Sequence, residues 1–314
     1  MKKNPMKILI TGSNGLLGQK LVYALRKHDD VSLIATARGE NRIHEKTGYV
    51  YESLDLTDAQ KVKSVIQQYQ PDCIIHTAAM TNVDACELDP AGCQLHNVDT
   101  VRHLLDACAN TRTHFIDIST DFVYDGTSGP YKETDPVGPL SVYARSKVTA
   151  EEMVMQSGLP WAILRTMIIY GVVDDVQRSN VILWTKSSLE QGKDINVIND
   201  QFRGPTLAED LAEACIQAAI RKVQGIYHVS GREVMSILEI AETVADYFGL
   251  DKKHIHPITT ASLNQPAARP LKTGFIIEKA ERDLGYHPRS LKEGIAIVEK
   301  QLSEKRTSEN KIGS

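Results

Sequence analysis

The sequence predicts an α/β fold with a doubly wound parallel sheet, and three observations support this prediction. Short apolar runs alternate with longer segments whose apolar residues recur at helical spacing. The first run, residues 8–11, leads directly into a glycine-rich turn at 12–18, after which a helical pattern begins. The 314 residues are 42% hydrophobic and 24% charged, which suits one large globular domain or a large and a small one. Such a chain packs as a parallel sheet with helices on both faces.

The expected elements follow in order along the first half of the chain. Strands are expected at 7–11, 31–36, 49–52, 72–76, 113–119 and 161–166. Helices are expected at 18–27, 58–69, 90–109 and 143–156. After residue 166 the alternation is less regular. There, helices are expected at 177–191, 207–221, 237–248, 277–284 and 291–302, a strand at 226–229 and a loop at 259–273.

The turn after the first strand carries three glycines, Gly12, Gly15 and Gly18. Glycine allows a tight strand-to-helix turn and a close approach of a pyrophosphate to the backbone, while the amides of the following helix attract the negative charge. We therefore expect a dinucleotide-binding Rossmann domain at 1–170, to which 200–235 return. Segments 171–199 and 236–302 are expected to form a smaller, interleaved substrate-binding region. The polar tail 303–314 has no apolar face and is expected to be disordered.

Charge, hydropathy and cysteine content exclude several classes of function. The formal net charge of −4 gives no sign of a nucleic-acid surface. No apolar stretch is long enough to be a membrane span or a signal peptide. The five cysteines form neither a C-x-x-C pair nor a ligand-spaced cluster with histidine. We therefore expect reduced thiols, no metal site and a cytoplasmic location.

Tyr143 and Lys147 are four residues apart and so lie on one face of the expected helix 143–156. A free phenol titrates near pH ~10, and a neighbouring ammonium lowers its pKa, which suits a residue that exchanges a proton with a carbonyl compound. A further donor is expected at the end of the preceding strand, where ligands of open α/β sheets bind, and Thr120 occupies that place. The order of these residues along the chain indicates a nicotinamide-dependent oxidoreductase.

The segment after the second strand indicates which dinucleotide binds. An acidic residue there suits the ribose 2′-hydroxyl of NAD, whereas an arginine suits the 2′-phosphate of NADP. The chain has Arg38 and no acid before Glu40, so NADP(H) is favoured over NAD(H). The alternative interpretation of Arg38 is a solvated surface cation without a ligand. Asp55 stands shortly before the expected helix 58–69, where an aspartate is commonly a helix cap, a role that Asp58 can also fill.

The glycine turn has the G-x-x-G-x-x-G spacing of the short-chain dehydrogenase/reductase superfamily, which the chain resembles. The stretch S-T-D-F-V-Y-D-G at 119–126 resembles the S-T-D-Y-V-F-D-G signature of the dTDP-4-dehydrorhamnose reductases, which are extended members of that superfamily. H-T-A-A-M-T-N-V-D at 76–84, D-Q-F-R-G-P-T at 200–206 and Arg269-Pro270 continue the likeness. It covers nearly the whole chain before the tail.

This resemblance implies an NAD(P)H-dependent reductase of a 4-keto nucleotide-diphosphate sugar, in the first place dTDP-4-dehydrorhamnose. The catalytic residues that it implies are Thr120, Tyr143 and Lys147. The cofactor-binding residues are Gly12, Asn14, Gly15, Leu16, Gly18, Arg38, Asp55, Leu56, Ala78, Ala79, Tyr143 and Lys147. The substrate-binding residues are Thr81, Asp121, Val123, Arg203 and Arg269.

Departures from the family pattern concern mainly the substrate side. Arg203 replaces a glycine of D-Q-x-G-x-P-T, Lys272 and Thr273 stand where Asn-Ser is usual, and Ala144 replaces a glycine. Arg203 and Lys272 either face a substrate diphosphate or are surface charges.

Three other functions are weighed against the reductase. Sugar-nucleotide dehydratases carry Asp-Glu after the threonine, but here Phe122 follows Asp121, which argues against dehydration. An epimerase or reductase of another nucleotide sugar is a weaker match. The family also resembles the regulatory β subunit of methionine adenosyltransferase, a non-catalytic NADP-binding protein with a protein partner. A homodimer is the default expectation for a soluble enzyme.

Overall fold

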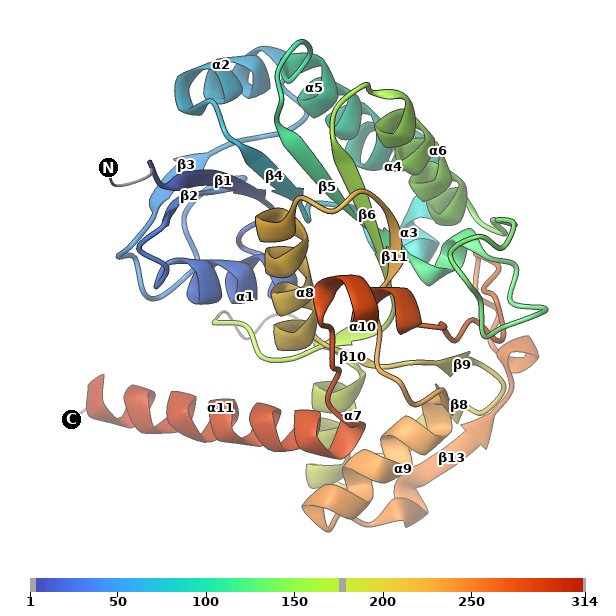
Figure 1. The fold of residues 1–314 in the computed structure, drawn as a ribbon. Helices are drawn as coiled ribbons and strands as arrows, with labels where there is room; N and C mark the ends of the chain where they lie inside the picture. Colours follow the sequence, from blue (N-terminus) through green and yellow to red (C-terminus); the bar gives the residue numbers. More distant parts are fainter. Residues whose placement is uncertain (1–3, 175–178, 313–314) are drawn as a thin grey trace.

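The computed structural model describes residues 4–174 and 179–312 and contains the predicted doubly wound sheet (Figure 1). Seven parallel strands lie in the order β11-β6-β5-β4-β1-β2-β3. Their bounds are β1 Met6–Thr11, β2 Val31–Ala37, β3 Val50–Ser53, β4 Cys73–His76, β5 His114–Thr120, β6 Trp161–Thr166 and β11 Gly225–His228. The order reverses direction at β1 and β4, which places a ligand crevice at the carboxyl ends of these two strands.

Helices cover both faces of this sheet (Figure 1). One face packs against α1 Leu16–Leu25, α8 Ala208–Arg221 and α10 Glu278–Leu284. The other packs against α2 Ala59–Tyr69, α5 Thr100–Ala107 and α6 Val142–Gln156. Side-chain caps start two of these helices, since Asp58 accepts from the amides of Gln60 and Lys61, and Ser141 accepts from that of Ala144. The second cap fixes where α6, with its Tyr and Lys, begins.

The helix expected at 90–109 is interrupted. The structure has α4 Pro90–Gln94, a π-helical turn at Leu95–Asp99 and then α5, and it adds a short helix, α3 Val83–Leu88, before them. The Thr100 hydroxyl donates to the carbonyl of His96 within the π turn, 2.8 Å away. A π turn holds more residues per turn than an α-helix, and periodicity over an apolar face does not reveal it.

A smaller region follows the large sheet. Its elements are α7 Val181–Glu190, β8 Ile195–Ile198, β9 Phe202–Arg203, β12 Met235–Ser236, α9 Ile237–Phe248 and β13 Ile255–Ile258. Short elements complete the fold: β7 Ile169–Tyr170, β10 Thr206–Leu207 and the 3₁₀ turns Asp121–Val123, Lys252–His254 and Thr260–Ser262. Helices α7 and α9 close an apolar cluster of their own with the parallel pair β8–β13. Residues 177–178 of the expected helix 177–191 lie outside the described residues.

The last helix, α11 Leu291–Ile312, corrects one expectation. Residues 303–312, expected to be disordered, continue this helix, and only 313–314 of the tail lie outside the described residues. The first turns of α11 pack through Leu291, Ile295 and Val298, and polar contacts follow further along the helix. The Lys305 ammonium donates to the carbonyls of Val173 and Asp174 at 2.7 and 2.6 Å, and Gln301 bonds Lys20 and Glu209. Within the described ranges, none of the helices has the length and apolar character that crossing a membrane requires.

Candidate functional site

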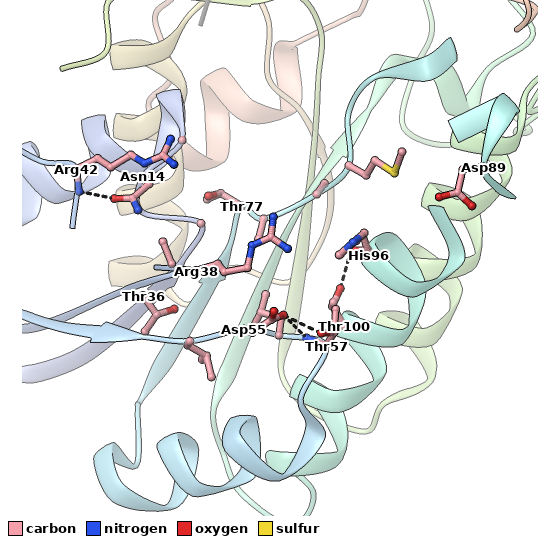
Figure 2. A pocket seen from close by; sticks show the side chains of 18 residues that line it. Asn14, Thr36, Arg38, Arg42, Asp55, Thr57, Thr77, Asp89, His96 and Thr100 are labelled. Atoms are coloured by element: carbon pink, nitrogen blue, oxygen red, sulfur yellow. Dashed lines mark hydrogen bonds between the residues drawn. The ribbon is translucent and has the colours of Figure 1, made fainter. Parts of the chain in front are cut away.

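A cavity of about 550 Å³ opens at the carboxyl ends of β1, β2 and β4, where the sheet order reverses (Figure 2). Eight predicted cofactor residues line it: Gly12, Asn14, Gly15, Arg38, Asp55, Leu56, Ala78 and Ala79. The other four predicted cofactor residues are not part of its lining: Leu16 and Gly18 belong to α1, and Tyr143 and Lys147 belong to α6. The cavity therefore unites segments from three βα units, as the parallel topology requires.

Two glycines of the turn are required by packing as well as by ligand approach. Gly12 has a φ of +71°, and a Cβ there would lie 2.9 Å from the Thr77 hydroxyl and from the Ala78 amide. A Cβ on Gly18 would lie 2.3 Å from the Gly12 carbonyl oxygen. Gly15 is the N-cap of α1 and has no side chain to cover the first helix amides. A helix N-terminus that lies at a cavity and lacks a side-chain cap is suited to an anionic group.

Asn14 connects the turn to the loop after β2. Its side-chain amide donates to the Glu40 carbonyl at 2.8 Å. Its oxygen accepts from the Arg42 amide at 2.9 Å (Figure 2). This loop carries both Arg38 and Arg42, and both line the cavity. Asn14 thus sets the position of two cations relative to the helix N-terminus.

Asp55 lies at the opposite wall of the cavity, below Arg38 (Figure 2). Its carboxylate accepts from the amide and the hydroxyl of Thr57 at 3.0 and 2.8 Å. These two bonds, with a smaller effect of Arg38, lower the pKa of Asp55, so the group is an anion at neutral pH. Because Asp58 caps α2, Asp55 is left to face the cavity.

Several lining residues carry no motif by which the sequence could have identified them. Arg42 lies in an irregular loop, Thr77 follows the end of β4, and His96 and Thr100 reach the cavity from the π turn and the start of α5. A cation four residues after Arg38 was the one available signal. The others depend on how segments distant in sequence come together.

Thr120, Tyr143 and Lys147 lie together at the carboxyl end of β5 and on the first turns of α6. All three are buried, and the Thr120 hydroxyl donates to Asp121 Oδ1 at 3.3 Å and accepts from the Phe122 amide at 3.2 Å. It is also near enough to the Tyr143 phenol to act on the pKa of that group. Phe122 packs edge-on against the Tyr143 ring at 5.9 Å between centroids. The Lys147 ammonium is 3.2 Å from a carboxylate oxygen of Asp117, on β5. The structure therefore brings the three predicted catalytic residues into one cluster.

The protonation of Tyr143 differs from the sequence expectation that Lys147 lowers its pKa. Burial raises the pKa of the Tyr143 phenol well above its ordinary value; the hydrogen bond with Thr120 opposes this, and the charge of Asp121 adds to it. The charge of Lys147 is instead held by Asp117. A phenol that stays protonated at neutral pH is in the state that a proton donor requires.

Three of the predicted substrate residues face protein. Arg203 is 2% exposed; its Nε is 2.8 Å from Asp121, and its other nitrogens donate to the carbonyls of Phe202, Pro270 and Leu271. Asp121 also accepts from the Thr273 hydroxyl at 2.5 Å. Val123 is in the apolar core. The Arg203 guanidinium therefore links residues 270–273 to the end of β5. It is neither a surface charge nor directed toward a diphosphate in this structure.

The other two predicted substrate residues remain accessible. Thr81 is exposed, and the half-buried Arg269 pairs with Asp84 at 2.7 and 3.0 Å. Lys272 lies over the ring of Phe202 at 5.3 Å. Whether Thr81 and Arg269 bind substrate stays a prediction.

The residues of the cavity fit a nicotinamide dinucleotide. A glycine cradle and uncovered helix amides suit a pyrophosphate, and two arginines beside them suit further phosphate charge. Of the residues that the structure describes, none form a group of three or more histidines, cysteines, aspartates and glutamates able to hold a metal ion.

Residues 6–304 match the profile of the family described as RmlD substrate binding domain. The chain is 36% identical over 258 residues to methionine adenosyltransferase 2 subunit beta of Xenopus laevis, covering 81% of this chain and 75% of that one. It is 32% identical to dTDP-4-dehydrorhamnose reductase of Aggregatibacter actinomycetemcomitans, covering 90% and 94%. The solved dTDP-4-dehydrorhamnose reductase of Bacillus anthracis in complex with NADP superimposes with a TM-score of 0.80 at 26% identity, covering 95% and 99%.

These comparisons confirm the family and the enzyme class predicted from the sequence, an NAD(P)-dependent oxidoreductase of the extended short-chain dehydrogenase/reductase type. They also confirm the fold, since relatives of that type share the seven-stranded parallel sheet flanked by helices. With nearly its whole length matched, the chain belongs to the RmlD substrate-binding domain family.

Proposed function

We propose that this protein reduces the 4-keto group of a nucleotide-diphosphate sugar with NADPH, and that a dTDP-4-keto-6-deoxyhexose such as dTDP-4-dehydrorhamnose is its substrate. One observation carries the proposal. Thr120, Tyr143 and Lys147 form a buried cluster beside a cavity built for a dinucleotide, in a chain that shares the S-T-D-F-V-Y-D-G stretch of the reductases.

Each residue of the cluster has a role in this reaction. When bound, NADPH supplies the hydride for the carbonyl carbon. Tyr143, kept protonated by its buried position, donates the proton to the carbonyl oxygen. Thr120 hydrogen-bonds the same oxygen and Tyr143, and so holds donor and acceptor in register. Lys147 directs its ammonium to the ribose hydroxyls of the nicotinamide side.

The surroundings of Tyr143 favour reduction over elimination of water. A dehydratase needs a second acid–base pair at the strand end, whereas here the residue after Asp121 is Phe122, whose ring covers Tyr143. Asp121 is occupied by Arg203 and Thr273. This leaves Tyr143 as the proton donor of the cluster.

NADPH is proposed over NADH because two arginines, Arg38 and Arg42, line the cavity on the loop that Asn14 holds. Guanidinium groups bind phosphate through paired hydrogen bonds, and the 2′-phosphate is the one feature that separates the two dinucleotides. The NADP in the Bacillus anthracis relative supports this choice.

Arg38→Ala is expected to weaken NADPH binding by about 10- to 100-fold, because hydrogen bonds to a charged group contribute about 1.5–3 kcal/mol. Binding of NADH, which lacks the 2′-phosphate, should change by less than about threefold. Titration of protein with each dinucleotide, followed by nicotinamide fluorescence, measures both constants.

Lys193→Ala is the matched control for this experiment. Lys193 is an exposed cation of the smaller region, remote from the cavity. It should leave both affinities unchanged. Equal loss of NADPH and NADH affinity in Arg38→Ala would show that Arg38 shapes the loop instead of reading the phosphate.

The sugar is proposed to bind between the catalytic cluster and the smaller region formed by 171–199 and 236–302. Thr81 and Arg269 border this side of the molecule, and Arg269 is held by Asp84 in a position to meet a diphosphate. A homodimer remains a prediction for the same protein.

The proposed activity is tested by mixing purified protein with NADPH and dTDP-4-dehydrorhamnose, and following the loss of nicotinamide absorbance. The expected result is stoichiometric NADPH oxidation and a sugar product reduced at C4, identified by mass spectrometry. NADPH binding without turnover of this substrate, or of any 4-keto-6-deoxy nucleotide sugar tried, would refute the proposal.

A second candidate function rests on the 36% identity to a methionine adenosyltransferase β subunit. In that case the protein binds NADP and a partner enzyme without turning over a sugar. Addition of the chain to a methionine adenosyltransferase catalytic subunit, with and without NADP, discriminates the two. A change in that enzyme's kinetics together with no sugar reduction would favour the second candidate.

A further inference from the structure

A row of buried polar side chains crosses the α5–α6 side of the sheet near its carboxyl edge. Thr11 on β1 bonds His76 on β4 through its hydroxyl and Nδ1, 2.7 Å apart. His76 is paired in register with Asp117 on β5, and Asp117 meets Lys147 on α6. Asp117 is fully buried and Lys147 is 2% exposed. Removing such charges from water costs free energy unless a counterion and further hydrogen bonds compensate the lost hydration.

A second buried ion pair, one helical turn further along α6, gives a direct comparison. Glu151 accepts from Arg165 Nε at 2.9 Å, from Arg165 Nη2 at 2.6 Å and from the Ser119 hydroxyl. Arg165 Nη1 donates in turn to the Tyr124 hydroxyl at 2.7 Å. Both carboxylate oxygens and the guanidinium are therefore satisfied, as is usual for a pair whose role is to hold the fold together.

The Asp117–Lys147 pair is incomplete in a way that the Glu151–Arg165 pair is not. One Asp117 oxygen contacts Lys147 at 3.2 Å, while the other, Oδ1, has no hydrogen-bond partner anywhere in the described ranges. The Lys147 ammonium has three N–H donors, and within those same ranges its hydrogen bond is to Asp117. Its remaining N–H donors lie beside the catalytic cluster, where they can bind a ligand.

Among the titratable groups around this pair, Asp117 is the counterion of the Lys147 ammonium. His76, on β4, is neutral, because burial and the Lys147 charge lower its pKa to about 3. Tyr143, on α6, is a protonated phenol. Glu151 and Arg165, on α6 and β6, neutralise each other, and Asp121 is paired with Arg203. Burial raises the pKa of Asp117 itself, and the charge and the hydrogen bond of Lys147 oppose this shift. Loss of the Asp117 charge would leave the ammonium unpaired in the interior.

We propose that Asp117 is a positioning residue for Lys147, which keeps the buried ammonium charged and directed toward the ribose hydroxyls of the nicotinamide dinucleotide. This inference rests on the proposed function, in which Lys147 binds that ribose. Asp117 touches neither substrate nor cofactor, and it acts through Lys147.

Asp117→Asn tests this role, because asparagine keeps the shape and removes the charge. A buried ammonium without a counterion loses its proton more readily, so its pKa falls. NADPH affinity of the variant should decline by about 10- to 100-fold as the pH rises from ~7 to ~9.5, whereas the affinity of the wild type should change by less than about threefold over the same range. NADPH fluorescence titrations across this range measure the effect without any sugar substrate.

Glu151→Gln is the matched control, since it breaks the neighbouring buried pair on the same helix. It should lower the thermal midpoint, and its NADPH affinity should follow the wild-type pH profile. A profile of Asp117→Asn that runs parallel to those of wild type and Glu151→Gln would overturn the inference. Should Asp117→Asn not fold, Asp117→Glu is measured instead: weaker NADPH binding with a wild-type pH profile supports the role, and wild-type affinity overturns it.

Failure of the inference and failure of the proposed function give different results. Wild-type protein that binds NADPH but does not reduce the sugar refutes the function, while the pH profiles still decide the role of Asp117. Wild-type turnover together with parallel pH profiles refutes the role of Asp117 and leaves the function intact.

Discussion

Tyr143→Phe is expected to lower the rate of NADPH-dependent sugar reduction by about 10²- to 10⁴-fold, which is the usual contribution of a positioned general acid. The substitution removes only the hydroxyl, and the ring keeps its contact with Phe122. NADPH affinity should therefore stay within about threefold of wild type. Stopped-flow or steady-state absorbance assays at saturating sugar and cofactor measure the loss.

Tyr247→Phe is the control for this substitution. The Tyr247 hydroxyl, on α9, donates to Glu299 on α11. The Tyr247→Phe substitution should leave the reduction rate unchanged. Retention of more than about a tenth of the wild-type rate in Tyr143→Phe would show that another group, or water, delivers the proton. Thr120 would then be the remaining hydroxyl of the cluster to examine.

Arg203→Ala is expected to cost about 3–5 kcal/mol of unfolding free energy, because it leaves the buried Asp121 without its counterion. It also removes the donors to the carbonyls of Pro270 and Leu271, so the segment around residue 271 loses its attachment to the end of β5. Urea unfolding followed by circular dichroism measures the difference from wild type.

The penalty should depend on pH in a definite direction. Burial already raises the pKa of Asp121 above its ordinary value, and loss of Arg203 raises this pKa further. A carboxyl whose pKa is higher in the folded than in the unfolded state loses stability as the pH rises above about 4. The deficit of Arg203→Ala should therefore be largest near neutral pH and shrink toward acid pH.

The exposed pair between Arg232 and Glu281 provides the control for Arg203. Arg232→Ala should cost less than about 1 kcal/mol and show no comparable pH dependence. A loss of that small size in Arg203→Ala would mean that solvent reaches Asp121 and that the clamp on residues 270–273 is weak.

The elements that the sequence predicted well are those with local causes. Alternating apolar runs predicted the strands from β1 to β6, and the glycine turn predicted the strand–turn–helix that begins the cavity. The spacing of Tyr143 and Lys147 predicted their common face on α6. Parallel topology then brought Thr120 to the same edge without further information.

The features that the sequence did not predict depend on partners far along the chain. Arg203 was expected either to face a diphosphate or to be a surface charge, but the fold surrounds it with Asp121 and the carbonyls of 270–271. Lys147 was expected to act on the Tyr143 phenol, but a buried acid on β5 holds its charge. Residues 303–312 continue α11, and Lys305 attaches them to the carbonyls of Val173 and Asp174. Periodicity carries no record of such long-range polar contacts.

The return of the chain to the large sheet has a consequence for how this protein can be divided or recombined. Strand β11 pairs with β6 across 58 intervening residues, and Phe275, Ile277 and Tyr286 belong to the same apolar cluster as residues of β1 and α1. During synthesis, the apolar core around the large sheet is therefore complete only after almost the whole chain has left the ribosome. The large sheet and the smaller region therefore cannot be exchanged between proteins as separate segments of sequence. A fragment that ends near residue 230 lacks these core residues and should aggregate rather than bind nucleotide.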